Sequence, residues 1–113
     1  MARTLITVPS TARRDEIIDI RVLIQHPMET GYRRSSEGAM LSRNLIRRFT
    51  CVFEENGKIG NGVPVFSAML YAAVAANPFL MFHARVTNSG TFIFNWEGDN
   101  GFVQSERALI KVT

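Results

Sequence analysis

The chain has little cysteine and no long apolar run. Cys51 is the single cysteine among 113 residues, so an intrachain disulfide is impossible and the fold must depend on packing. No stretch approaches the ~18 to 20 consecutive apolar residues of a membrane-spanning helix. The apolar residues near the start are too few for the core of a secretory signal, and Pro9 ends them. We therefore expect no membrane partner, and the residues alone imply a cytosolic protein or one exported by another route.

Histidine is also scarce, which bears on metal and nucleophile chemistry. His26 and His83 are the two histidines, and neither lies at a zinc-site spacing from the other or from Cys51. We therefore expect no metal and no other cofactor. A nucleophile built from Cys51 and a histidine is an alternative, but Cys51 falls in an apolar strand pattern, where cysteine usually acts as a small hydrophobic residue.

The charge is mildly basic and unevenly placed. The formal net charge is +3. Up to Thr50 there are nine arginines and five acids, a balance of +4, and from Cys51 onward four basic residues and five acids give −1. The arginine-rich segment, Arg33 to Arg48, therefore offers an alternative function as a basic domain that binds anions or nucleic acid. Most aromatic residues align with strand interiors instead of interleaving with these arginines, so we expect no nucleic acid partner.

Alternating apolar and polar residues predict strands through most of the chain. The clearest runs from Ile17 to Gln25, with Ile18, Ile20, Val22 and Ile24 on one face. The other expected strands cover residues 3–8, 45–54, about 58–68, 79–86, 91–96 and a last segment ending near 112. Asn56-Gly57 predicts a hairpin turn, and residues 69–76 are ambiguous between coil and one helical turn. About seven short strands separated by turn residues predict an all-β, immunoglobulin-like antiparallel β-sandwich, here as one domain over residues 1–113, with a small barrel as the alternative.

A polar loop after the clearest strand is the best candidate for function. The block His26-Pro27-Met28-Glu29-Thr30-Gly31 opens it, and Arg33 follows. Pro27 ends regular pairing. Residues 29–44 are too polar for a core and too long for a tight turn, and loops of this length in compact domains tend to be functional or flexible. A second distinctive block is Asn77-Pro78-Phe79-Leu80.

These blocks carry a resemblance to a known family. The block from His26 to Gly31, then Asn56-Gly57-Lys58, then Asn77-Pro78-Phe79-Leu80, and finally Trp96 with Asp99 and Gly101, resembles the SoxZ family of sulfur-oxidation proteins. The blocks span nearly the whole chain in order, and the first is the most specific. The segment 41–46 departs from the Ile-Pro-Ala-His-Phe-Ile sequence expected at that place.

The resemblance implies a non-catalytic role beside a second subunit. In that family the chain pairs with SoxY, whose C-terminal cysteine arm carries covalent sulfur intermediates during thiosulfate oxidation and presents them to the other Sox enzymes. Residues 108–113 contain no glycine and no cysteine, so we expect the scaffold half of the SoxYZ carrier and not an enzyme. The resemblance also implies a periplasmic location, with export alongside a signal-bearing partner.

Two roles remain open for the first block. Pro27, Met28 and Gly31 suit a shaped structural turn, and His26 would then anchor the loop by hydrogen bonds. The alternative is a surface that binds partner proteins, with Glu29 and Arg33 as the exposed contacts. The candidate site residues, for partner binding or loop structure, are His26, Pro27, Met28, Glu29, Thr30, Gly31, Arg33, Asn77, Pro78 and Phe79.

Overall fold

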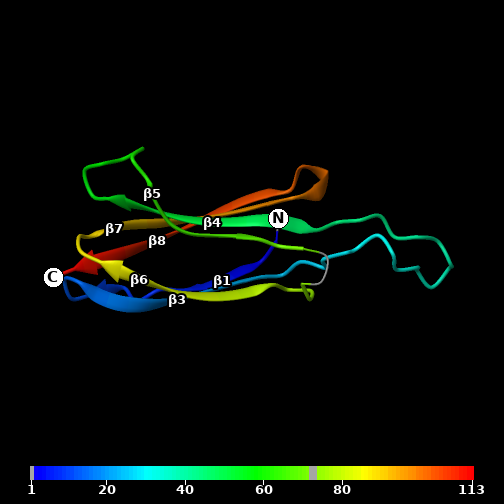
Figure 1. Ribbon diagram of the computed structural model, residues 1–113, viewed down its shortest axis with the longest axis horizontal. Coiled ribbons are helices and arrows are strands. Elements are labelled where there is room, and N and C mark those ends of the chain that lie inside the picture. The colour runs from blue at the N-terminus through cyan, green and yellow to red at the C-terminus, as the bar shows by residue number, and fades with distance from the viewer. Residues whose placement is uncertain (1, 72–73) are drawn as a thin grey trace.

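Short alternating segments form strands through most of the chain. The computed structural model describes residues 2–71 and 74–113, and within them eight strands and one 3-10 turn. The strands are β1 Thr4–Thr7, β2 Thr11–Ala12, β3 Glu16–Ile24, β4 Ile46–Glu55, β5 Val63–Met69, β6 Phe79–Val86, β7 Gly90–Gly98 and β8 Val103–Val112; the turn η1 is Asp99–Gly101. Two sheets face each other in layers (Figure 1). The predicted immunoglobulin-like sandwich is confirmed.

The smaller sheet has the order β1-β3-β6 and is antiparallel throughout. Its centre is β3, the strand expected from the clearest alternation. Ile18, Ile20, Val22 and Ile24 are all buried, as the period of two requires. On β6 the expected inward face also holds, with Phe82 and Val86 buried.

The larger sheet has the order β2-β8-β7-β4-β5. One pairing departs from the expected antiparallel arrangement: β2 runs parallel to β8, with Thr11 opposite Lys111 and Ala12 opposite Val112. The pairing is possible because the chain crosses from β1 in one sheet to the edge of the other before it enters β3.

The core lies between the sheets and is rich in aromatic rings. Trp96, Phe49, Phe92 and Phe94 are among its largest fully buried side chains. Phe49 lies 5.2 Å from Trp96 between ring centroids. Where the two sheets meet at β5 and β6, the rings of Phe66 and Phe82 stack at 4.5 Å. Aromatic pairs at these separations add to the stabilisation from burial.

In the middle of the chain, the structure corrects the predicted start of one strand and describes only part of the ambiguous segment 69–76. The strand predicted from about residue 58 begins at Val63, because Gly57 and Gly60 have positive φ and form turns before it. In the ambiguous segment, β5 ends at Met69, and the Val74 amide donates to the Tyr71 carbonyl at 2.9 Å. Residues 72 and 73 of that segment lie outside the described residues.

The loop between β3 and β4 projects from one end of the sandwich (Figure 1). The molecule measures 57 × 24 × 20 Å. Glu29 and Asn44 exchange backbone hydrogen bonds of 2.8 Å in both directions, and farther out Leu41 donates to Arg33 at 2.9 Å. We call residues 25–45 the hairpin loop, since its two legs pair as far as the bridge between Arg34 and Met40.

Candidate functional site: the His26 corner and the hairpin loop

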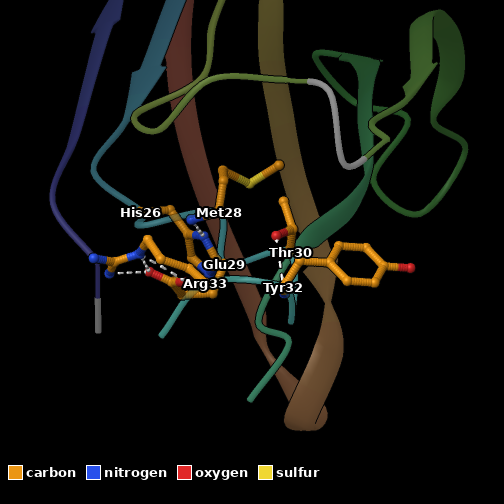
Figure 2. Close-up of polar contacts among 6 residues, drawn as sticks. All are labelled: His26, Met28, Glu29, Thr30, Tyr32 and Arg33. Carbon is orange, nitrogen blue, oxygen red and sulfur yellow. Dashed lines mark hydrogen bonds and ion pairs between the residues drawn. The ribbon is translucent and has the colours of Figure 1, made fainter. Parts of the chain in front are cut away.

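His26 is buried at the base of the hairpin loop, directly after β3. Its ring is 5% exposed and packs edge-on against Phe102 at 5.2 Å. Its Nδ1 accepts a hydrogen bond from the Met28 amide at 3.1 Å (Figure 2). Burial lowers the pKa of His26 below its ordinary value, although Asn44 and Asp99 pull it upward. The ring is therefore a neutral anchor whose proton lies on Nε2.

The corner joins the two distinctive sequence blocks. The His26 amide donates to the Asn77 side-chain oxygen at 2.9 Å, and the Asn77 amide donates to the His26 carbonyl at 2.8 Å. Asn77 has φ +55°, a left-handed conformation that asparagine tolerates better than most residues. Beside it, the Pro78 carbonyl accepts a hydrogen bond from Ile24 at 3.2 Å. Residues 51 positions apart therefore form one structural unit.

Met28 turns the chain back against the sandwich. Its φ is +53°, which is uncommon for a side chain of this kind. The side chain points toward the strands (Figure 2) and is 5% exposed. Its sulfur accepts a hydrogen bond from the Ile46 amide at 3.3 Å. His26, Pro27 and Met28 therefore form a shaped corner at the base of the hairpin loop.

Glu29 and Arg33 form an ion pair on one side of the hairpin loop. Arg33 Nε donates to Glu29 Oε1 at 3.0 Å, and Nη2 contacts the same oxygen. This bond lowers the pKa of Glu29. The Arg33 side chain is 67% exposed but that of Glu29 only 15%, so Arg33 is the more accessible member of the pair.

Thr30 and Tyr32 lie on the other side of the loop from Arg33 (Figure 2). The Thr30 hydroxyl accepts a hydrogen bond from the Tyr32 amide at 3.2 Å. Between them Gly31 has φ +92°, and an added Cβ would lie 3.3 Å from the Arg43 Cβ. Glycine therefore allows the turn and the close approach of the returning leg. The loop presents two chemically different faces.

Asp99 holds the returning leg, a role that the sequence did not reveal. Arg43 donates to both carboxylate oxygens of Asp99 at 2.9 Å, and the Leu45 amide donates to the same carboxylate at 3.0 Å. Arg43 is the main cause of the lowered pKa of Asp99. In the sequence Asp99 stood out only among the residues that carry the family resemblance; its partner Arg43 is 56 positions away.

The arginines of the segment 33–48 are used in different ways. Arg33 and Arg43 pair with acids, and Arg34 donates to the Gly38 carbonyl at 2.9 Å. Among the described residues, Arg47 and Arg48 have no carboxylate within ion-pair distance. Carboxylates therefore pair with two of the five arginines of the segment, Arg33 and Arg43.

Cys51 and the histidines do not assemble a reactive centre. Cys51 is fully buried on β4, and burial raises its pKa to about 12. His83 lies on an exposed face of β6, where its Nε2 pairs with Asp19 at 2.8 Å. Residues 2–71 and 74–113 contain no group of three or more histidine, cysteine or acidic side chains placed to hold a metal ion. They also contain no helix that could cross a membrane.

One protein-family model matches most of the chain. The model described as sulphur oxidation protein SoxZ matches residues 6–108. The chain belongs to the SoxZ family. It is thus a subunit of a sulfur-oxidation (Sox) system, and the resemblance noted in the sequence is confirmed. No sequence among curated proteins matches the chain significantly.

Solved structures share the fold of this SoxZ-family chain. A superoxide reductase (neelaredoxin) from Ignicoccus hospitalis has a TM-score of 0.75 at 18% identity, covering 99% of this chain and 82% of that one. The superoxide reductase from Nanoarchaeum equitans scores 0.66 at 13%, covering 96% and 90%. The sulfur carrier protein SoxY from Chlorobium limicola f thiosulfatophilum scores 0.64 at 13%, covering 97% and 78%. At these identities the likeness concerns the fold alone.

Proposed function

We propose that this chain is the non-catalytic scaffold subunit of a sulfur-carrier complex and that it binds a SoxY-type protein. The observation that carries the proposal is the family match over residues 6–108. The state of Cys51 supports it, because a fully buried thiol with a pKa near 12 is neither accessible nor ionised at neutral pH. The cysteine that carries sulfur intermediates would then belong to the partner.

The outer face of the smaller sheet offers a surface for that partner. Leu5, Leu23 and Phe79 lie in one row across β1, β3 and β6. Leu5 is 63% and Phe79 57% exposed, and Met81, two residues along β6, is 50% exposed. We call Leu5, Leu23, Phe79 and Met81 the apolar row. Contiguous exposed apolar side chains of this kind mark interaction surfaces.

The hairpin loop would meet the other enzymes that act on the carried sulfur. It projects from the end of the sandwich (Figure 1), and Arg33 on it has a side chain that is 67% exposed. The His26 corner fixes the base of the hairpin loop to the sandwich. The loop would therefore present its binding surface in the same position whatever the position of the partner's cysteine-bearing arm. In the same proposal the complex works in the periplasm and is exported together with a signal-bearing SoxY-type subunit.

Co-expression with a SoxY-type protein tests the proposal. A stable heterodimer should co-purify, and Cys51→Ser should still form it and support full thiosulfate oxidation with the other Sox enzymes. Arg33→Ala should also form the heterodimer but slow the sulfur-transfer steps. Failure to co-purify would refute the scaffold role, and loss of activity in Cys51→Ser with the heterodimer intact would make this chain a catalytic subunit.

A further inference from the structure

A small cavity lies near the His26 corner, between the hairpin loop and the start of β4. Its volume is about 270 Å3. Its polar lining comes from Thr30, Tyr32, Arg43, Arg47 and Tyr71, with Leu70 among its apolar residues. Nothing in the proposed scaffold role requires two arginines, a threonine and two tyrosines to line one cavity.

A β-bulge directs Arg47 to this cavity. Ile46 pairs with Gly98 and Arg48 with Glu97, so Arg47 is an extra residue without a partner on β7. On the β5 side its carbonyl accepts a hydrogen bond from Leu70 at 2.8 Å. Bulges re-aim side chains and recur beside functional sites. Arg47 lines the cavity, whereas the next residue, Arg48, does not.

The carboxylate of Asp99 holds the Arg43 guanidinium in place. Its Nε and one Nη bind the two oxygens of Asp99, each at 2.9 Å, and the Leu45 amide fixes that carboxylate at 3.0 Å. A guanidinium has five N–H donors, so three remain after this bidentate contact. The Arg43 side chain is 54% exposed, and Arg43 is among the residues that line the cavity.

The charges around the cavity do not cancel. Arg43 and Arg47 give +2 and Asp99 gives −1, so the lining keeps one positive charge in excess. The other nearby pair, Glu29 with Arg33, is neutral as a pair and lies across the loop from Tyr32 (Figure 2). Because the Thr30 hydroxyl accepts from the Tyr32 amide, its own proton is left to donate.

We propose that this cavity binds one small tetrahedral oxyanion of the sulfate, sulfonate or phosphate class. Guanidinium and hydroxyl donors suit such oxygens, which accept several charge-assisted hydrogen bonds at once. One anion would neutralise the excess charge of the lining. Arg47, placed by the bulge, is the main binding residue, and Arg43 is the pre-oriented second donor.

The test uses the whole chain at low ionic strength. Sodium sulfate, phosphate and methanesulfonate are titrated by calorimetry and by amide chemical shifts, with sodium chloride at matched ionic strength as reference. Methanesulfonate stands for an oxyanion at the end of an organic stem, and the inorganic salts for the free ion. Saturable binding of any of the three that shifts the amides of Tyr32 and Leu70 supports the site, and their order tells which source it prefers.

Two neighbouring arginines give matched variants. Arg47→Gln should weaken binding at least tenfold, while Arg48→Gln, which removes the same charge one residue away, should leave it unchanged. Equal losses in both variants, or equal effects of chloride, would overturn the proposal. Both variants should still co-purify with a SoxY-type partner. Failure of that heterodimer with oxyanion binding intact would therefore refute only the scaffold role.

Discussion

His26 shows how one residue serves structure although it has the chemistry for catalysis. Judged from the sequence alone, the imidazole of His26 and the carboxylate of Glu29, three residues later, could act together as an acid-base pair. In the structure the ring lies inward, accepting from the Met28 amide, while the Glu29 carboxylate binds Arg33 on the loop surface. Neither group faces a nucleophile, so the residue anchors the corner.

The buried His26 predicts that stability falls as the medium becomes acidic. Its folded-state pKa lies below that of the unfolded chain, so from about pH 6.5 downward the unfolded state binds a proton that the folded state refuses. The stabilisation is fully present above that pH and is lost as the pH falls through the folded-state pKa. The thermal midpoint should therefore decrease between pH 7 and 5.

Variants identify the group behind that decrease. His26→Asn keeps a short acceptor near Nδ1 but cannot titrate; it should be less stable at pH 7 by about 1–3 kcal/mol, from lost ring packing, and should show a flatter pH profile. His83→Asn removes the exposed histidine instead and should retain the wild-type decline. Equal slopes in wild type and His26→Asn would contradict the role of this ring.

At the scale of elements, alternation predicted the strands well and their partners poorly. β3, β6 and β7 appear where the period of two placed them, because burial of one face fixes that pattern in the sequence. The parallel pairing of β2 with β8 leaves no such pattern, since two residues are too few for a period. The bulge at Arg47 could not be predicted from the sequence either, because an extra residue in one strand is recognised only from its register with the neighbouring strand.

The sequence drew attention to the blocks of the candidate site but did not reveal the contacts between them. His26 and Asn77 each stood out in sequence, yet their mutual hydrogen bonds connect residues 51 apart. The same holds for Arg43 with Asp99, which are 56 positions apart, and for Tyr71, which lines the cavity beside the hairpin loop. Such pairs depend on how the ends of β3, β4, β6 and β7 meet at one end of the sandwich, which local sequence does not encode.

The junction between β3 and β6 depends on the side chain and the conformation of Asn77. Asn77→Ala removes the acceptor of the His26 amide and places alanine at φ +55°, so we expect a loss of about 2 kcal/mol in the free energy of unfolding. Asn77→Gly keeps the conformation accessible and should lose about 1 kcal/mol. Urea denaturation measures both, and wild-type stability in the two variants would show that this junction contributes little.

At the scale of the whole molecule, the two outer faces of the sandwich differ. Across the larger sheet, Thr50, Asn95 and Ser105 lie in one polar row. The smaller sheet instead exposes Leu5, Leu23 and Phe79 side by side, flanked by Met81. The apolar residues of the smaller sheet follow one another across all three of its strands, and that continuity favours this face as the interface with a SoxY-type subunit.

The apolar row therefore predicts a substitution that weakens the heterodimer while it leaves the stability of the isolated chain nearly unchanged. Phe79→Glu adds a charge within the proposed interface and should weaken the heterodimer at least tenfold in a calorimetric titration. Its effect on the isolated chain should be small, within about 1 kcal/mol, because Phe79 is 57% exposed. Leu109→Glu is the matched control, since Leu109 is 75% exposed on β8 of the larger sheet and carries the same strand penalty. If Leu109→Glu weakens the heterodimer while Phe79→Glu does not, the partner covers the larger sheet instead, and the apolar row must serve another contact.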